Sequence, residues 1–464
     1  MAIRPKELTQ LGLRSDIARS LAVNSLKPYR YRSKDELLSL LRAVVDDPDA
    51  YKSDPIWGKL AEHLSPSPEE ALAFRTYALR EEAVSFKTYG NPFIESLAKQ
   101  QMQMAMRLPV AVSGALMADA HPGYGLPVGG VLATENQVIP YAVGVDIGCR
   151  MSLSVLDSGA QFARRYTHQI KAALRACTHF GMDGGLPFRQ EHEILDCPEF
   201  FATDLLKRLH GKAVRQLGSS GGGNHFVEFG ELTLFEDNVL GLSPGTYAAL
   251  VSHSGSRGMG ATIATAYSEI ARDQCRLPRG ATNFAWLDLD SEAGAEYWLS
   301  MNLAGDFAKA CHEQIHKNLT RELGVSVLAT LSNHHNFAWK EDIGGRPLIV
   351  HRKGATPAGK GVAGFIPGSM ASPGYLVVGC GEDASLSSAS HGAGRTMSRQ
   401  KAKESFTRSA MRKALSEKGV TLMGGSLEET PSAYKDIDQI MACQTGLVTV
   451  HGKFMPRIVR MNKE

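Results

Sequence analysis

Apolar and polar residues in the first part of the chain recur with the period of an α-helix. A capping box at Ser33–Glu36 predicts the start of an amphipathic helix, and Pro48 follows its end. The apolar side of this helix is formed by Leu37, Leu38, Leu41, Val44 and Val45. A second capping box, which begins at Ser67, predicts another helix that runs to about Phe86. We therefore expect residues 1–82 to form a small helical extension that serves packing or interaction and carries no chemistry.

The pattern changes from about residue 83 onward. Short apolar runs between glycine-rich turns predict strands at Val128–Thr134, Met151–Leu156, Phe226–Phe229, Tyr247–Ser252, Pro347–His351, Leu376–Gly379 and Val448–Val450. Longer runs with helical period predict helices at Phe162–His179, Ser291–Leu323 and Arg399–Glu417. Strands and helices do not alternate with the regular spacing of a doubly wound sheet. We therefore expect residues 83–464 to form one large, mixed α+β domain.

Composition narrows the class of protein. The chain has 464 residues, of which 43% are hydrophobic and 21% charged, as in ordinary globular proteins. Its 51 Lys and Arg against 48 Asp and Glu give a net charge of +3, which excludes only the simplest basic-tail nucleic-acid binder. The longest apolar stretch, Leu108–Ala120, is too short to span a membrane, and no secretory signal follows Arg4 and Lys6. Because the seven cysteines lack paired spacing, we expect a cytoplasmic protein with free thiols and no membrane partner.

The 46 glycines are concentrated beside polar and metal-capable side chains. Glycine lets the backbone turn sharply and bring bare N–H groups close to an anion. One such segment is weak evidence, because most are simply turns, but eight occur in this chain. They are Asp119–Gly125, Gly144–Arg150, Gly221–Glu228, His253–Gly258, Asn333–Asn336, His351–Thr356, Ile366–Met370 and Ser390–Arg395.

Five residues of these segments form a plausible metal-binding set. It comprises one carboxylate, one thiolate and three imidazoles: Asp146, Cys149, His225, His253 and His335. Since a thiolate has several lone pairs and can bridge two cations, these five groups could hold two metals with open coordination positions. The gaps between them are too long for a zinc finger. Taken singly, each residue is more often a satisfied core histidine or an inert cysteine.

A second candidate metal motif lies in the predicted helix Ser291–Leu323. The segment His312–His316 matches the H-E-x-x-H pattern of zinc proteases, with both histidines on one helical face. A protease would also need a third ligand and a substrate-binding edge strand. Because the surrounding residues follow the pattern of an ordinary packed amphipathic helix, we favour a chance match.

His391 lies in a glycine turn with Arg395 nearby and no apolar periodicity around it. A neutral imidazole there can serve as a nucleophile toward phosphorus, with the arginine countering the developing charge. The alternative is a turn that only leads into the next helix. That helix is strongly basic and could guide a polyanion or be a solvated face. Its basic residues are Arg399, Lys401, Lys403, Arg408, Arg412, Lys413 and Lys418.

These segments together resemble the RtcB family of RNA-splicing ligases, over about residues 84–463. The resemblance rests on six segments in family order: Val145–Cys149, Gly223–Phe226, His253–Gly258, His335–Asn336, Arg352–Ala355 and Ser390–Arg395. It implies an RtcB-like fold for residues 83–464 and an enzyme that uses GTP and Mn²⁺. Such an enzyme joins an RNA 3′-phosphate or 2′,3′-cyclic phosphate to a 5′-hydroxyl. The helical extension is absent from the compact members of that family.

The resemblance also implies a centre of two Mn²⁺ ions bridged by Cys149. Asp146 and His225 would complete the protein ligands of one ion, and His253 and His335 those of the other. His391 would attack the α-phosphate of GTP, release pyrophosphate and become a covalent histidine–GMP adduct. The GMP would pass to the RNA 3′-phosphate and then be displaced by the 5′-hydroxyl, a cyclic end being opened first. An archease-like activator is a possible partner.

The resemblance further implies a nucleotide site and RNA contacts. Within the nucleotide site, the carboxylate of Glu228 matches the two N–H donors on the pairing edge of guanine. The amide of Asn224 can donate to a phosphate oxygen, and Phe226 is placed to pack against the nucleotide. The other nucleotide-site residues are Ser369, Ala393, Gly394, Tyr434 and Lys463. The candidates for binding RNA phosphate are Arg257, Lys353 and Arg395.

Two other functions use the same residues. One is a dinuclear-metal phosphodiesterase or other hydrolase that forms no covalent nucleotide adduct. The other is an RNA-binding protein that has lost catalysis. A hydrolase needs neither a nucleophilic His391 nor a guanine-reading Glu228, and a retired enzyme has no need of the complete ligand set, so the sequence favours the ligase.

Overall fold

The computed structural model describes residues 7–8, 11–13, 16–65, 75–181 and 185–462. The chain divides into two compact units, Met1–Arg75 and Thr76–Glu464. The sequence-based boundary between residues 82 and 83 lies seven residues beyond this division.

The first unit is helical, as expected, and has a core of its own. Its described helices are α2 (Asp16–Ser25), α3 (Lys34–Asp46) and α4 (Gly58–Leu64), with 3-10 turns η1 (Lys27–Tyr29) and η2 (Asp49–Tyr51). The capping box is present: the Glu36 carboxylate accepts from the backbone N–H of Ser33 at 2.8 Å, and the Ser33 hydroxyl accepts from the Glu36 N–H at 3.4 Å. The buried core includes Leu13, Leu41, Trp57 and Leu60.

The helix expected from Ser67 to Phe86 falls partly on residues 66–74, which lie outside the described residues. From Arg75 onward the expectation is wrong, because this segment is extended and is tied to other parts of the chain. The backbone N–H of Tyr77 donates to the carbonyl of Arg276 at 2.9 Å, and the Tyr77 ring packs on Trp286. Long-range contacts therefore override the local helical pattern here.

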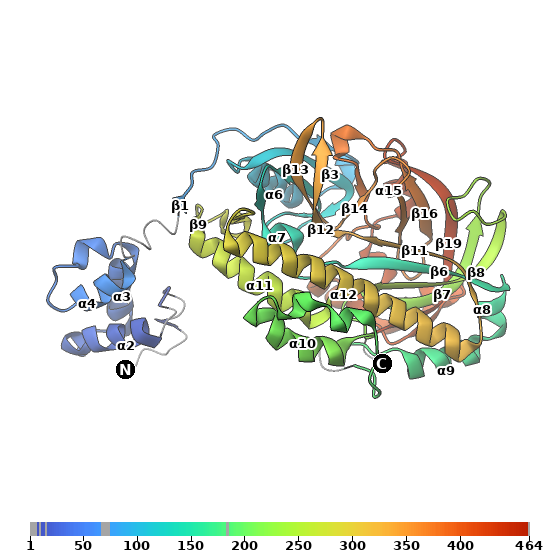
Figure 1. Cartoon of the computed structure of the whole chain (residues 1–464), viewed down its shortest axis with the longest axis horizontal. Helices are drawn as coiled ribbons and strands as arrows, with labels where there is room; N and C mark the ends of the chain where they lie inside the picture. The colour runs from blue at the N-terminus through green and yellow to red at the C-terminus, as the bar shows by residue number, and fades with distance from the viewer. Residues whose placement is uncertain (1–6, 9–10, 14–15, 66–74, 182–184, 463–464) are drawn as a thin grey trace. The chain divides into compact units, whose positions relative to one another are not determined.

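The second unit is built on two sheets (Figure 1). The larger one has the order β11-β6-β8-β7-β19-β16-β15, with β18 paired to β19. Its strands are β11 (Val327–His334), β6 (Arg150–Gly159), β8 (Gly245–Ser254), β7 (Phe226–Leu234), β19 (Val448–Met461), β16 (Gly374–Gly379), β15 (Ala363–Ile366) and β18 (Thr421–Met423). The smaller sheet has the order β12-β13-β4-β3-β2. Its strands are β12 (Asn336–Ile343), β13 (Arg346–Lys353), β4 (Val128–Thr134), β3 (Ala111–His121) and β2 (Lys87–Thr88).

Three further pairings involve short strands. β5 (Gln137–Val138) pairs with β10 (Leu287–Asp288), and β14 (Ala355–Pro357) pairs with β17 (Ser388–Ser390). The strands β1 (Arg75–Thr76) and β9 (Cys275–Arg276) form the remaining pair.

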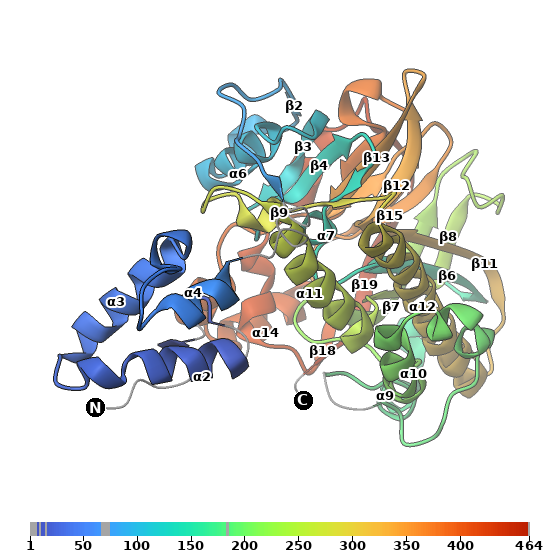
Figure 2. The same cartoon turned by 60° about the vertical axis from the view of Figure 1, so that its left-hand side comes forward.

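Long helices lie on one side of the larger sheet, as Figures 1 and 2 show. They are α9 (Thr167–Cys177), α10 (Asp204–Gln216), α11 (Arg257–Gln274) and α12 (Glu292–Leu323). Ile315 and Leu319 of α12 pack with Val227 and Leu250 of the sheet in one apolar cluster. The other helices of this unit are α6 (Ser96–Met106), α7 (Pro140–Val143), α8 (Phe162–Arg165), α13 (Arg399–Ser405), α14 (Arg408–Glu417) and α15 (Ile437–Ala442).

The α+β class is confirmed, and every predicted strand lies within an observed one. The helix predicted at Ser291–Leu323 is α12, whose N-cap is Ser291. Two predicted helices are each divided in two: Phe162–His179 into α8 and α9, and Arg399–Glu417 into α13 and α14. In the second case Thr407 breaks the helix because its hydroxyl caps α14 by accepting from the N–H of Ala410.

Candidate metal centre and nucleophile

The strand register of the larger sheet brings the five predicted metal ligands together at the same end of four neighbouring strands. Arg150 of β6 pairs with Ser254 of β8 and with His334 of β11. Phe226 of β7 pairs with His253 of β8. The starts of β6 and β7 and the ends of β8 and β11 therefore coincide. The loops just before β6 and β7, and the residue after β11, bring Asp146, Cys149, His225 and His335 to the position of His253.

The ligand atoms form two groups that share one sulfur. In the first, the Cys149 Sγ lies 3.1 Å from the Nε2 of His253, which lies 3.2 Å from the Nε2 of His335. In the second, the same Sγ lies 3.5 Å from the Nε2 of His225, which lies 2.9 Å from an Asp146 carboxylate oxygen. Within each group the donor atoms are all within 4.8 Å of one another. The residues thus fit two cations bridged by a thiolate.

The protonation of His253 supports this fit. Its Nδ1 lies 3.0 Å from the carbonyl oxygen of Asn224 and must carry the proton, because a carbonyl only accepts. The Nε2 of His253 is therefore a bare lone pair, and it faces a sulfur and another imidazole nitrogen. Burial lowers the pKa of His253 to about 3, so this imidazole stays neutral. Lone pairs that converge in this way are stabilised by a cation.

The pKa values of the Cys149 thiol and the Asp146 carboxyl group also bear on cation binding. Burial, with the nearby Asp146 carboxylate adding to it, raises the pKa of the Cys149 thiol well above its ordinary value. Burial alone would raise the pKa of Asp146, but its contacts with His225 and Cys149 outweigh burial and lower it to about 2. Since a metal displaces the thiol proton, cation binding at Cys149 is coupled to proton release.

Glycines leave the room that these ligands need. A Cβ on Gly255 would lie 1.9 Å from a carboxylate oxygen of Asp146, and one on Gly221 would lie 1.9 Å from the Nδ1 of His225. Asn336 ties the neighbouring loops together, because its amide donates to the carbonyl of Asp146 at 3.3 Å and accepts from the N–H of Gly354 at 2.8 Å. The glycine-rich motifs are therefore close-packing positions around the ligands.

His391 lies beside this centre. Its ring centroid is 4.9 Å from that of His335, and its Nδ1 lies 2.6 Å from an oxygen of Asp119. The same oxygen accepts from the backbone N–H groups of His391 and Gly392, at 3.1 and 3.3 Å. Burial alone would raise the pKa of Asp119, but His391 and Lys435 outweigh it and hold that pKa below its ordinary value. The carboxylate therefore fixes the His391 proton on Nδ1 and leaves Nε2 free to react.

Asp119 is a site residue to which sequence reasoning assigned no role. It lies on β3 in the smaller sheet and is fully buried. Its segment, Asp119–Gly125, is one of the eight glycine-rich motifs, which is the signal that could have marked it. Its link to His391 spans 272 residues along the chain, so no local pattern reveals the pair.

Several of the predicted nucleotide residues lie near the candidate ligands or near His391. Phe226 packs on the ring of His253 at 5.6 Å between centroids, and Glu228 follows on the same face of β7. Gly394, at φ +73°, follows His391, and a Cβ there would lie 2.0 Å from the carbonyl oxygen of Asp119. The Tyr434 hydroxyl donates to Glu429 and lies beside Arg395.

The remaining nucleotide residues are less informative. Ala393 is buried, Asn224 is half-buried, and the half-buried Ser369 shares a hydrogen bond with Ser372 at 2.6 Å. Lys463 lies outside the described residues.

The three predicted RNA-binding side chains are all engaged by the protein. Arg257 donates to the hydroxyl of Ser219 at 3.2 Å, and Lys353 donates to the carbonyl of Tyr141 at 3.2 Å. Arg395 forms an ion pair with Glu429 at 3.2 Å. Contact with RNA would have to replace these partners, and their role in RNA binding stays a prediction.

The H-E-x-x-H segment is part of the core. His312 and His316 share one face of α12, and both contact the hydroxyl of Ser252 on β8, at 2.6 and 2.7 Å. The other nitrogen of His312 bonds the carbonyl of Ser254, and that of His316 bonds the hydroxyl of Ser154. With both nitrogens of each ring satisfied, the pair joins α12 to the sheet, as the preference for a chance match anticipated.

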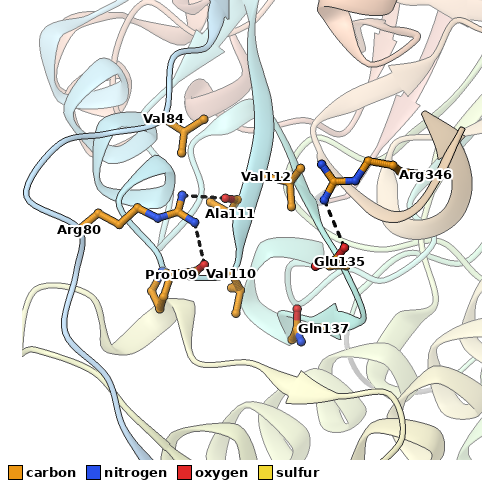
Figure 3. Close-up of a pocket in the computed structure, with 9 residues that line it drawn as sticks. All are labelled: Arg80, Val84, Pro109, Val110, Ala111, Val112, Glu135, Gln137 and Arg346. Atoms are coloured by element: carbon orange, nitrogen blue, oxygen red, sulfur yellow. Dashed lines mark hydrogen bonds and ion pairs between the residues drawn. The ribbon is translucent and has the colours of Figure 1, made fainter. Parts of the chain in front are cut away.

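A surface hollow drawn in Figure 3 lies apart from these residues. Arg80 on its wall donates to the carbonyls of Pro109 and Ala111, both at 2.8 Å, and Arg346 pairs with Glu135 at 3.2 Å. Its lining includes no histidine, cysteine or aspartate. None of the predicted site residues lies in it.

Comparison with known proteins identifies the family. The model of the family described as tRNA-splicing ligase RtcB matches residues 101–199 and 197–462. The chain belongs to the RtcB family of RNA-splicing ligases. Among its relatives, RNA-splicing ligase RtcB of Escherichia coli strain K12 is 29% identical over 398 residues, which cover 79% of this chain and 94% of the relative. The tRNA-splicing ligase RtcB of Nanoarchaeum equitans is also 29% identical, over 74% of this chain and 86% of its own length.

The match to the RtcB family includes all five candidate ligands, Asp119 and His391. It does not include the helices of the unit Met1–Arg75. Among the described residues of this RtcB-family chain, no helix combines the length and the apolar character that a membrane crossing requires.

The shared sulfur leads to a prediction about metal content. Cys149→Ala removes a donor from both groups and should abolish retention of both cations, whereas His335→Ala should remove only one. The measurement is manganese per chain by mass spectrometry after loading and desalting. The exposed Cys380→Ala is the matched control. Undiminished metal in Cys149→Ala would refute the bridging thiolate.

Proposed function

We propose that this RtcB-family chain is a GTP- and Mn²⁺-dependent RNA ligase that works through a covalent histidine–GMP intermediate. It would join RNA 3′-phosphate or 2′,3′-cyclic phosphate ends to 5′-hydroxyl ends. The observation that carries the proposal is the position of His391. Its ring centroid lies 4.9 Å from that of the candidate ligand His335, and its Nδ1 is hydrogen-bonded to Asp119.

His391 supplies the nucleophile. Because Asp119 holds the proton on Nδ1, the lone pair of Nε2 attacks the α-phosphorus of GTP. The Nε2–P bond forms while the bond from the α-phosphorus to the bridging oxygen breaks, and pyrophosphate leaves. The positive charge that develops on the ring is stabilised by the Asp119 carboxylate, as in other carboxylate–histidine pairs.

The candidate ligands would act at the same step. Asp146, Cys149 and His225 would hold one Mn²⁺, and Cys149, His253 and His335 the other. When bound, the two ions would offset the charge of the triphosphate as pyrophosphate departs. Because Cys149 and the three imidazoles are buried, the ions would act in a site of low dielectric, where charges interact more strongly than in water.

The ligation itself follows by two exchanges at phosphorus. An oxygen of the RNA 3′-phosphate displaces His391 from the guanylyl group, which regenerates the imidazole. The 5′-hydroxyl oxygen then attacks the activated 3′-phosphorus and GMP leaves, so a new phosphodiester is formed. A cyclic end first needs water to open it to a 3′-phosphate.

Glu228 supports the choice of guanine. Its side chain is 5% exposed, and within the described part of the chain no hydrogen bond reaches its carboxyl group. Burial raises the pKa of Glu228 to about 8. Two N–H donors from guanine would stabilise the ionised carboxylate, whereas adenine presents an acceptor at one of these positions. A buried group left unsatisfied by the wrong base discriminates strongly.

Two further proposals concern the cellular compartment and a partner protein. The seven cysteines are free, and a metal-binding thiolate requires reducing conditions, which supports the cytoplasm as the compartment. An archease-like activator is a further proposed partner.

A phosphodiesterase would use the same ligands without His391, and labelling with GTP separates the two functions.

Guanylylation tests the nucleophile. Incubation with α-labelled GTP and Mn²⁺, followed by denaturing electrophoresis, should show label that acid removes and alkali does not, as for a phosphoramidate. His391→Ala should carry no label. Asp119→Asn should be labelled about 10²-fold more slowly, because Nδ1 loses its carboxylate acceptor.

The control for this experiment is His192→Gln, since His192 pairs with Glu313 on the outside of α12. It should be labelled like the wild type. Label on the His391→Ala protein would remove the nucleophile assignment, and a wild-type protein that cleaves phosphodiesters without being labelled would favour the hydrolase.

The buried carboxyl group of Glu228 also leads to a prediction about the preference for GTP over ATP. Glu228→Gln should lower the preference for GTP over ATP in the labelling reaction by about tenfold or more, because an amide N–H then faces a guanine donor. Glu231→Gln is the control, since Glu231 lies on the same strand but pairs with Arg164 and Arg457. An unchanged GTP-to-ATP ratio in Glu228→Gln would count against this role.

The raised pKa of Glu228 predicts how stability depends on pH without nucleotide. Between the ordinary value of 4.5 and about 8, native Glu228 keeps a proton that the unfolded chain has lost. The native state therefore binds more protons, and its stability should fall as the pH rises through this window. Unfolding temperatures at pH 6 and pH 8.5 should differ more in the wild type than in Glu228→Gln. Equal differences in the two proteins would contradict the assignment.

A further inference from the structure

The first unit carries a segment in which basic and aromatic residues alternate. Residues 17–34 contain five basic residues and no Asp or Glu. The segment covers α2 after its first residue, Asp16, and η1, and the sequence Tyr29-Arg30-Tyr31-Arg32 comes just before the capping box of α3. Since the formal charge of the whole chain is only +3, this is a local concentration of positive charge.

Tyr31 is unusually exposed for an aromatic side chain. Its exposed fraction is 85%, larger than that of any other large apolar or aromatic side chain among the described residues. The guanidinium of Arg30 lies over its ring, 4.9 Å from the centroid. One face of an aromatic ring is thus held in solvent beside a cation.

Tyr29 anchors the segment. Its ring stacks on Trp57 at 5.7 Å with an interplanar angle of 15°, and Trp57 is buried in the core of the unit. The guanidinium of Arg32 lies 5.7 Å from the Tyr29 centroid. The chain next to the exposed ring of Tyr31 is therefore tied to the core through Tyr29.

Of the five cations in this segment, Lys34 pairs with Glu7 at 2.6 Å and Arg19 also has a partner. Among the described residues, no carboxylate forms an ion pair with Lys27, Arg30 or Arg32, all of which are exposed. The acids that follow the segment are Asp35 and Glu36. Glu36 is used by the capping box, and its pKa is lowered by the hydrogen bonds from Ser33 and by the charge of Arg32. The positive charges of Lys27, Arg30 and Arg32 are available to an external anion.

From these observations we infer that the patch formed by Lys27, Arg30, Tyr31 and Arg32 binds single-stranded RNA. An exposed ring stacks on an unpaired base of any sequence, and flanking guanidinium groups bind the phosphates and stack on bases. The inference rests on the proposed function in so far as the RNA is the substrate. Because both units belong to one chain, RNA bound at the patch is present at a raised effective concentration for the catalytic unit.

The patch acts on binding and not on chemistry. Contacts remote from the reacting atoms, made equally in ground and transition states, lower KM without raising kcat. Loss of the patch should therefore raise KM for a long RNA and leave kcat and His391 labelling unchanged. A ligation substrate only a few nucleotides long should be insensitive to it.

The test measures RNA affinity of the full chain by fluorescence anisotropy. The probe is a labelled 20-nucleotide single strand with hydroxyl ends, used without GTP or Mn²⁺. Tyr31→Ala should weaken RNA binding about 5-fold or more. Tyr31→Phe should bind the RNA like the wild type, because the phenyl ring still stacks. Arg30→Gln with Arg32→Gln should lower the dependence of log affinity on log salt by roughly 1.4, for two lost phosphate contacts.

The matched control is Arg42→Gln with Lys59→Gln. These two residues are exposed on α3 and α4 of the same unit, and each has an acid nearby in sequence, Asp46 and Glu62. This control should bind RNA like the wild type. Equal folding of all variants is checked by circular dichroism, and Tyr31→Ala removes no side chain from the buried core.

The proposal is overturned if the patch variants bind the RNA as tightly as the control. That result is also the one expected if the patch serves a protein or an anionic membrane instead. Labelling of the wild-type chain with GTP tests the proposed ligase function independently of the RNA-binding patch. If labelling fails while the patch variants lose RNA affinity, the RNA surface stands and the ligase mechanism falls.

Discussion

The site depends on the convergence of five metal-capable side chains, among which the Nε2 of His253 carries no proton. His253 has its proton fixed on Nδ1 by a backbone carbonyl, so its Nε2 faces Cys149 and His335 as a bare acceptor. Acceptors that face each other at about 3 Å are unfavourable unless a proton or a cation lies between them. The register of β6, β7, β8 and β11 keeps these atoms close despite this cost. A slip of one residue in any of these pairings would turn the ligands to the other face of the sheet.

The packing around the ligands explains the composition of the sequence. Gly148, Gly221 and Gly255 stand where a side chain would overlap a ligand or a neighbouring backbone. Asn336 joins two loops through both ends of its amide. These residues do no chemistry, yet they determine where the reactive atoms lie. Their substitution would disturb the centre without removing any ligand.

Much of this arrangement could be predicted from the sequence. Strand β4 and helix α12 have strong local signals and are observed where they were expected. The ligands could be proposed because glycine-flanked Cys, His and Asp are unusual together. By contrast, β3 lies in a run of small and apolar residues without clear alternation, and its Asp119 acquires a role only when tertiary contacts bring it to His391. The extended segment after Arg75 escaped prediction because its partners, such as Trp286, are about two hundred positions away in the sequence.

The candidate metal ligands and the proposed nucleophile are positioned by different sheets. Four candidate ligands are positioned by the larger sheet, whereas His391, the proposed nucleophile, is held by Asp119 on β3 of the smaller one. His335 stands at the seam, between the last residue of β11 and the first of β12. A small shear of one sheet over the other would therefore move a candidate cation ligand and the His391 imidazole relative to each other. In this architecture the geometry of the cation site and the position of His391 are coupled through one residue, His335.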